Sequence, residues 1–244
     1  MQRSEIDFTQ HFPVSSRFYF QLDVVTPDEL LRRLDRRELE LRRRFEQIID
    51  EMTQLRDTLA RVANDRPDDG DSLPREPGED ATTATPEQLA ARLHSLNTLR
   101  AQRAVSQADK SAQEIVGVSA SFDDIRLEIA NNRIDAADRQ ERLRTQICEP
   151  LDLIVDALFS QFKNQLQTVQ KTLEEEGPYV DDAQLARQQT DEILIELDKV
   201  LQKMLELEDY NALVQLVRRL IDDQNELSER TKALRKKKAL ELLK

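Results

Sequence analysis

The residues that could support catalysis are few and widely separated. The two histidines, His11 and His94, each stand alone, and the sequence contains no His-x-x-x-His, Cys-x-x-Cys or Gly-x-Ser-x-Gly motif. Metal sites, thiol redox pairs and nucleophile elbows depend on those spacings. The carboxylates at Glu174–Glu176 could attract a cation, but such runs are typical of solvated helix ends, and a di-iron bundle would need Glu-x-x-His pairs. We therefore expect no enzyme, no catalytic residue, no cofactor, no metal site and no small-molecule substrate.

The single cysteine and the basic residues have simple structural interpretations. Cys148 follows Ile147 on an apolar stripe, which predicts a small buried side chain rather than a reactive thiol. Arginines crowd residues 32–44, but acidic residues four positions earlier predict a self-paired helix face.

The C-terminal basic run is a candidate docking patch. It consists of Arg235, Lys236, Lys237 and Lys238. Residues 228–244 carry a net charge of +5, against −5 for residues 64–85. Cations near a helix C-terminus are favourable in themselves, and the alternatives are docking to the acidic segment, to another subunit or to an anionic surface.

Composition predicts an all-α protein. The 244 residues include four glycines and no tryptophan, with 5% aromatic and 34% charged residues. Multi-stranded sheets need Gly-rich tight turns, whereas charged residues, Leu, Ala and Gln favour helices and coiled coils. We expect long amphipathic helices in an extended coiled coil or helical bundle.

Charge and hydropathy restrict the partners and the location. The net charge of −12 argues against nucleic acid or anionic lipid as the main partner. No apolar run approaches the ~18 residues of a transmembrane helix, and Met1–Gln10 lacks a signal-peptide pattern. The chain as given is expected to be soluble, with protein partners that are either copies of itself or foreign helices.

The first helix has the strongest pattern in the sequence. Residues 17–25 alternate apolar and polar side chains, which predicts a short N-terminal β-strand and makes residues 1–25 a candidate end of a truncated β domain. Thr26, Pro27 and Glu29 then predict a helix start. A heptad helix over 26–63 follows, interrupted on its seam only by Glu38. The predicted packing seam here is Leu31, Leu34, Leu41, Phe45, Ile48, Met52, Leu55 and Leu59.

The middle of the chain predicts a linker and a long helical region. Residues 64–85, rich in Pro, Gly and acidic residues, are interpreted as a disordered acidic linker. Thr85, Pro86 and Gln88 then predict a second helix start. A helical region over 86–177 follows, with a kink near Pro150 and a stop at Gly177-Pro178. Asn131-Asn132 leaves open whether the helix breaks there. An alanine stripe at 101, 104, 108 and 112 predicts little buried area.

The last third, 181–244, predicts a C-terminal αα-hairpin. The phase of the apolar pattern changes near Glu208-Asp209, and Asp209 could cap a final helix. The competing interpretation is one continuous helix through Asp209. The predicted packing seam is Ile193, Leu197, Val200, Met204 and Leu207, and the later stripe is Leu213, Leu216, Leu220, Leu227 and Leu234.

Both ends of the chain resemble a known class of protein. At the N-terminal end the segments are residues 18–30, which begin Phe-Tyr-Phe and end Thr-Pro-Asp-Glu-Leu, and residues 42–49. At the C-terminal end they are residues 204–211, 220–224 and Lys236–Lys238. They look like the C-terminal helical region of large, uncharacterised membrane-anchored proteins of planctomycete-type bacteria. The resemblance implies that the chain is the tail of a longer protein, with an extracytoplasmic, membrane-tethered location; otherwise a cytoplasmic one is expected.

These observations lead to three functional hypotheses. The first is a non-enzymatic scaffold module that self-associates, or braces a larger envelope-associated protein, through coiled-coil helix packing. The second is a regulatory adaptor that binds a partner helix in a groove. The third is an enzyme whose site carries no recognisable motif.

Overall fold

A computed structural model describes residues 25–64, 85–134 and 137–242, and the all-α prediction is confirmed for them. The main helices are α1 (Pro27–Asn64), α2 (Pro86–Asn131) and α6 (Val180–Leu242). Between α2 and α6 lie α3 (Ala137–Leu143), α4 (Glu149–Leu153) and α5 (Ser160–Glu174), joined by the π-helical turns η1 (Arg144–Cys148) and η2 (Ile154–Phe159). The strand predicted within 1–25 and the linker predicted over 64–85 fall, except for their edge residues, outside the described part of the chain.

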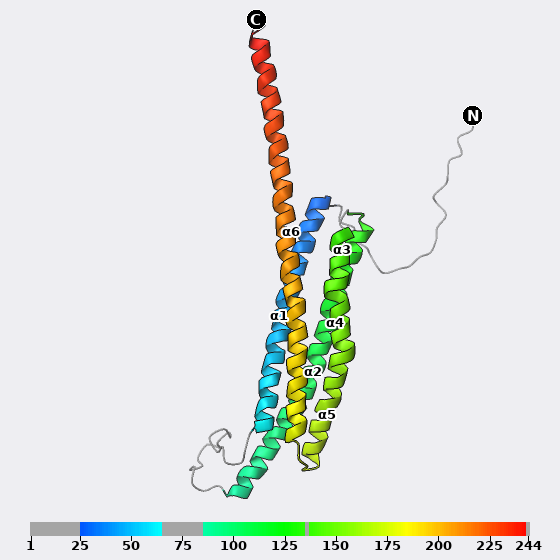
Figure 1. Ribbon diagram of the computed structural model, residues 1–244, viewed down its shortest axis with the longest axis vertical. Helices are drawn as coiled ribbons and strands as arrows, with labels where there is room; N and C mark the ends of the chain where they lie inside the picture. The colour runs from blue at the N-terminus through cyan, green and yellow to red at the C-terminus, as the bar shows by residue number, and fades with distance from the viewer. Residues whose placement is uncertain (1–24, 65–84, 135–136, 243–244) are drawn as a thin grey trace, which may run out of the picture.

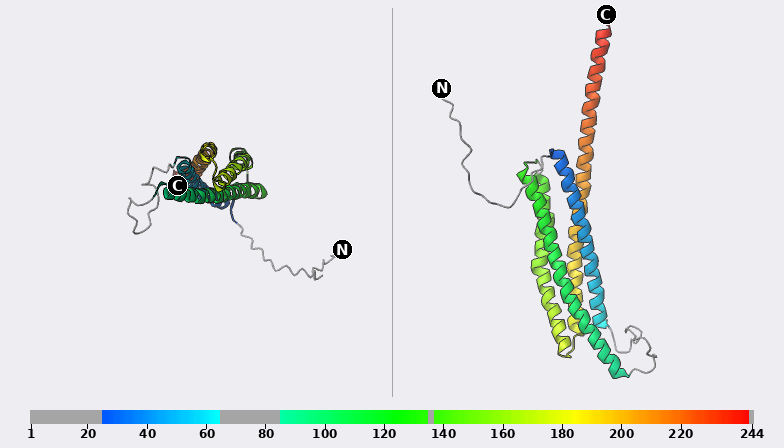
Figure 2. Two further views of the ribbon diagram at one scale, coloured as in Figure 1. Left: turned by 90° about the horizontal axis from the view of Figure 1, so that it is seen from below. Right: turned by 180° about the vertical axis from the view of Figure 1, so that it is seen from behind.

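The helices form an antiparallel four-helix bundle, in which α3 to α5 act as one rod (Figures 1 and 2). Contacts that run in opposite directions along the chain establish the topology. Between α1 and α2, Arg37 pairs with Glu128 at 2.5 Å and Glu51 accepts a hydrogen bond from Lys110 at 2.8 Å. Between α2 and the rod, Asp109 pairs with Lys163 at 2.7 Å and Ser119 donates to Asp152 at 2.7 Å. The bundle therefore runs up, down, up and down, with α6 packed between α5 and α1.

Two predicted helix starts are present in the structure. The backbone N–H of Glu29 donates to Thr26 Oγ1 at 3.3 Å at the start of α1. Thr85 and Gln88 make a complete capping box at the start of α2, with distances of 3.4 and 3.1 Å. These bonds satisfy N–H groups that have no partner inside the helix.

Two left-handed residues end helices and turn the chain back. Arg133 has φ 53° after α2, and the Ile134 N–H donates to the Ile129 carbonyl at 3.2 Å. Glu176 has φ 55° after α5, where the Gly177 N–H donates to the Thr172 carbonyl at 2.8 Å. Both are Schellman caps, so the helix does break after Asn131 and does stop at Gly177.

The rod passes through Pro150 without stopping. Proline lacks an N–H and crowds the carbonyl four residues earlier. The backbone widens into η1 just before Pro150, where the Glu149 N–H donates to the Arg144 carbonyl, and again into η2 just after it. Local π-helical turns are a recognised way for a helix to absorb such a residue.

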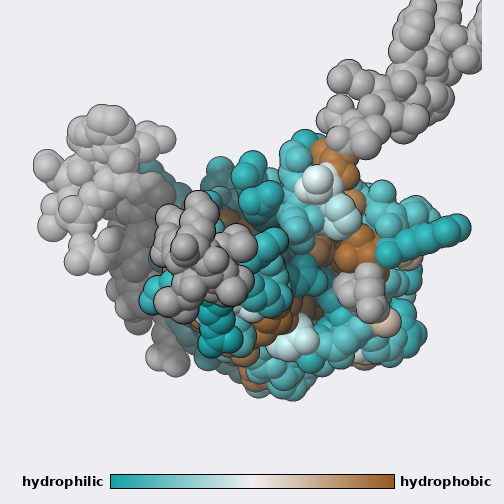
Figure 3. Space-filling model, turned by 90° about the horizontal axis from the view of Figure 1, so that it is seen from above, coloured by the Kyte–Doolittle hydropathy of each residue, from teal (hydrophilic) through white to brown (hydrophobic). Residues whose placement is uncertain are grey.

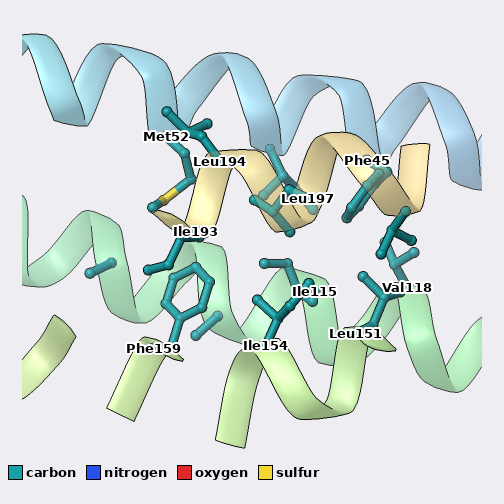
Figure 4. Close-up of a cluster of buried hydrophobic side chains, with 14 of the residues drawn as sticks. Phe45, Met52, Ile115, Val118, Leu151, Ile154, Phe159, Ile193, Leu194 and Leu197 are labelled. Atoms are coloured by element: carbon teal, nitrogen blue, oxygen red, sulfur yellow. The ribbon is translucent and has the colours of Figure 1, made fainter. Parts of the chain in front are cut away.

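The core is a single apolar column along the bundle axis. Figure 4 shows Phe45 and Met52 of α1 facing Ile115 of α2, Phe159 of η2 and Ile193 of α6. Phe159 and Phe162 meet edge to face, with ring centroids 6.4 Å apart. The alanine stripe is also buried: its members are Ala101, Ala104, Ala108 and Ala112.

The predicted C-terminal hairpin is wrong, and the competing interpretation of one continuous helix is right. Helix α6 runs unbroken from Val180 to Leu242 through Asp209. The sequence has no glycine or proline in this span, so nothing forces a turn. The change of phase near Asp209 moves the apolar stripe to another face of the same helix. None of the helices in the described residues is long and apolar enough to cross a membrane.

Candidate functional site: the projecting arm of α6

The C-terminal half of α6 extends beyond the bundle as a single helix (Figures 1 and 2). We call residues 213–242 the arm. Among the described residues, the last ion pair of α6 with the bundle joins Arg218 to Asp28, at the start of α1, at 3.7 Å. Beyond Arg218, the arm side chains that the structure describes are exposed.

A stripe of leucines runs along the arm at intervals of seven residues. Leu213, Leu220, Leu227 and Leu234 are 57%, 59%, 62% and 61% exposed. Leu216, Val217 and Ile221 widen the stripe near its base and are also exposed. A seven-residue repeat keeps one edge of a helix apolar, which supplies one of the two apolar positions of a coiled-coil heptad.

The arm stripe lies on the side of α6 that faces away from the bundle. Asn211, Val214 and Arg218 continue the bundle-facing side and are half-buried. Leu213 lies two residues after Asn211, about 200° further around the axis at 3.6 residues per turn. A partner helix could therefore lie on the arm without meeting the chain's own bundle.

The predicted packing seams lie inside the bundle, on helices α1 and α6, which pack against each other. The seam residues of α1 are buried except for the partly buried Leu41: Leu31, Leu34, Phe45, Ile48, Met52, Leu55 and Leu59. The seam residues of α6 are all buried: Ile193, Leu197, Val200, Met204 and Leu207. These residues hold the bundle together and leave the arm stripe as a separate apolar surface.

The candidate basic docking patch lies near the tip of the arm. Arg235, Lys236 and Lys238 are exposed there, and the side chain of Lys237 lies outside the described ones. Seen from the end at which the arm projects, the molecular surface is mostly hydrophilic, with hydrophobic patches between (Figure 3).

A buried polar cluster joins three helices at the base of the arm. Arg139 of α3, whose side chain is 8% exposed, donates to Glu38 Oε1 at 2.7 and 3.1 Å and to Asp35 Oδ1 at 2.7 Å. Asn211 of α6 donates to Glu38 Oε2 at 2.9 Å. Both carboxylate oxygens of Glu38 are therefore bonded, as a buried charge requires.

Burial of Glu38 raises the pKa of its carboxyl, although the Arg139 guanidinium acts in the opposite direction. The residue borders a cavity of about 230 Å³ that Phe122, Met204 and Asn211 also line. Because the cluster ties α6 to α1 and α3 where the arm begins, it fixes the direction in which the arm leaves the bundle.

Two contacts between partly buried side chains support the same junction. Arg42 Nε lies 2.9 Å from Glu208 Oε2, which links α1 to α6. The Arg142 guanidinium lies over the Tyr210 ring, 4.0 Å from its centroid. Cation–π contacts of this kind add a modest attraction.

The residues that could do chemistry are not brought together. His94 is half-buried on α2, and Cys148 is buried, with Sγ 3.8 Å from the Ser119 carbonyl. Burial raises the pKa of the Cys148 thiol to about 11, with smaller contributions from Asp123 and Asp152, so little thiolate forms at neutral pH. Among the residues that the structure describes, no group of three or more His, Cys, Asp or Glu could hold a metal ion.

An apolar groove of about 710 Å³ lies on the side of the bundle between the π-helical rod and α6. Pro150, Leu153 and Ile154 form one wall, and Val200 and Lys203 form the other. Leu153 is 67% exposed there. The groove is a second apolar surface of the molecule.

Comparisons with protein families, curated proteins and solved structures find no match for this chain.

Sequence reasoning found the arm leucines but not their role. The hairpin prediction assigned them to a helix that folds back, and their seven-residue spacing beyond the bundle seam was the signal of an outward-facing surface. Glu38, as the residue that interrupts the α1 seam, was the signal of the buried cluster. Its partner Arg139, 101 positions later in the chain, has no local sequence signal.

Proposed function

We propose that the chain is a non-enzymatic scaffold module that self-associates, with the arm of α6 forming a coiled coil with another copy. The observation that supports this most directly is the leucine stripe at 213, 220, 227 and 234, exposed on a helix that projects beyond its own bundle. Soluble monomers rarely expose large contiguous apolar patches, and such patches mark interaction sites.

The physics of an unsupported helix favours the same function. Helices in water gain most of their stability from packing of an apolar face, and helical segments without such packing are marginal. Within the arm, Arg230 pairs with Glu226 and Lys232 with Glu229 at 2.7 Å. Such pairs contribute only about 0.2–0.5 kcal/mol each, so burial of the leucines by a second helix would be the larger stabilising contribution.

The resemblance at both ends of the chain supports a setting for this module. In that setting the bundle is the helical tail of a larger envelope-associated protein, and arm pairing joins two such proteins. The groove beside Leu153 favours a second candidate function, a regulatory adaptor in which a partner helix packs against the bundle.

Leucine substitutions in the arm test the proposal. We expect the double variant Leu220→Glu, Leu227→Glu to weaken self-association at least about a hundredfold, because each apolar side chain removed from an interface loses about 1.5–3 kcal/mol. Sedimentation equilibrium of the full chain over a wide concentration range measures the association constant.

The control is Leu153→Glu, which places one such charge at a similarly exposed leucine on the bundle. It should leave the association constant unchanged. A wild-type chain that stays monomeric at every concentration would contradict self-association and favour the adaptor, and a strong effect of Leu153→Glu would move the interface to the groove.

A further inference from the structure

Charge is distributed very unevenly along the C-terminal part of α6. Within the arm, residues 213–229 contain four acidic and two basic residues, whereas residues 230–238 contain six basic and no acidic ones. Apart from Val214, Gln215 and Arg218, the described side chains of residues 213–238 are exposed. The arm therefore carries a group of acidic residues at 222–229 and a strongly basic tip along the same leucine stripe.

The leucine spacing gives each arm residue a position relative to the stripe. With Leu213, Leu220, Leu227 and Leu234 at one core position, the other core position holds Val217, Gln224, Thr231 and Lys238. Asp223 and Arg230 each follow a stripe leucine by three residues and lie on the same edge of the stripe. Ser228 and Arg235 each follow a leucine by one residue and lie on the opposite edge.

We infer that the partner of the arm is a second copy of this chain running antiparallel, an inference that rests on the proposed self-association. In an antiparallel pair, each edge of the stripe meets the same edge on the partner helix. When residue 213 of one arm lies opposite residue 238 of the other, Asp223 faces the partner's Arg230. The two-fold symmetry makes this pair twice. The basic tip of each arm then lies beside residues 213–221 of the other arm, which carry two arginines, rather than beside the other basic tip.

A parallel pair would have the opposite electrostatics. Opposite edges of the stripes would meet, placing Arg230 near the partner's Arg235 and the two basic tips side by side. Every stripe leucine occupies a core position in either direction, so the leucines alone do not choose between them. Edge charges set the orientation of such coils, and here they favour antiparallel pairing with one bundle at each end.

Charge reversal separates the two orientations. For an antiparallel pair, Asp223→Arg and Arg230→Asp should each lower the association constant about tenfold, because each turns two attractive contacts into repulsive ones. The double variant should recover to within about threefold of the wild type. Sedimentation equilibrium of the full chain at low ionic strength gives these constants.

Comparison of the single and double variants also separates the contact between helices from an ion pair within one helix. Arg230 pairs with Glu226 on its own helix, and Arg230→Asp loses that pair in both the single and the double variant. Recovery in the double variant therefore reports the contact between helices. Asp222→Arg and Lys236→Asp, on the outer face of the arm, are matched controls and should change association by less than about threefold.

Each remaining outcome decides against part of the account. Stronger association of Arg230→Asp than of the wild type would show a parallel pair and overturn the orientation while leaving self-association intact. Equal association of the wild type and all charge variants would overturn the charge argument in the same way. A monomeric wild type would overturn the orientation and the proposed function together.

Discussion

Glu38 occupies a position where the heptad pattern of α1 calls for an apolar side chain. The structure places Arg139 and Asn211 around its carboxylate, so the charge is bonded rather than isolated. Removing one partner of a buried ion pair usually destabilises a protein more than replacing both partners with apolar side chains. The cluster is therefore a specific device that fixes how α1, α3 and α6 meet at the base of the arm.

Glu38 should give the protein an unusual pH dependence. Because burial raises the pKa of Glu38 above its usual value of 4.5, the folded protein holds this proton at a pH where the unfolded chain has lost it. The contribution of Glu38 to the free energy of unfolding is then most favourable below pH 4.5 and declines as pH rises through the folded pKa. Chemical denaturation across this range should show the wild type losing stability relative to Glu38→Gln as pH rises.

Glu51→Gln is the matched control, for which we expect the opposite dependence of stability on pH. Hydrogen bonds from Lys110 and Gln107 lower the pKa of Glu51, so its contribution is present above pH 4.5 and is lost as pH falls through the folded pKa. If the stability difference from the wild type changed with pH in the same direction for both variants, burial would not be the dominant effect on the pKa of Glu38.

Single residues were predictable where their environment is set by neighbours in the sequence. The seam residues of α1 and α6 follow from periodicity, and their burial is a direct consequence of it. Arg139 could not be found in this way, because an arginine on a short helix resembles any solvated arginine until its distant partner is known.

The turn after α2 is decided by one backbone conformation. Asn131-Asn132 left the sequence ambiguous, and the structure ends the helix with Arg133 in the left-handed region, φ 53°. That region costs a residue with a side chain about 1–2 kcal/mol, and glycine adopts it freely. Ile134, half-buried after the turn, helps to hold Arg133 there.

Replacing Arg133 with glycine should stabilise the bundle. We expect Arg133→Gly to raise the free energy of unfolding by about 1 kcal/mol, which corresponds to roughly 2–4 °C in Tm for a domain of this size. Arg103→Gly, within α2, should instead destabilise by about 1 kcal/mol. Calorimetry measures both, and a loss of stability in Arg133→Gly would show that the side chain itself stabilises the turn.

Element boundaries were predictable where a cap or a breaker stands in the sequence. Thr26, Thr85 and Gly177 mark three such boundaries, and the structure places helix ends at each. The hairpin at Asp209 was wrong because a capping residue can also lie inside a helix, and a change of apolar phase does not by itself end one. Only the absence of Gly and Pro favoured continuity.

The molecule as a whole combines two parts with different sources of stability. The bundle buries its own seams in one continuous core, whereas the described part of the arm beyond Arg218 exposes its apolar stripe. Composition and periodicity predicted long packed helices, but the number of helices that share a core depends on contacts between segments far apart in the chain. The arm is the length of α6 that extends past the other helices that the structure describes.

Hydrogen exchange of the full chain, followed by mass spectrometry over a range of protein concentrations, tests whether the arm is the self-association surface. Pairing should bury the leucine stripe and slow local opening of the helix. We predict that amides of residues 219–242 become markedly more protected as concentration rises, while those in the core of α1 and α2 keep the same protection. Arm amides that exchange at the same rate at every concentration, or protection that appears in the bundle instead, would contradict the account.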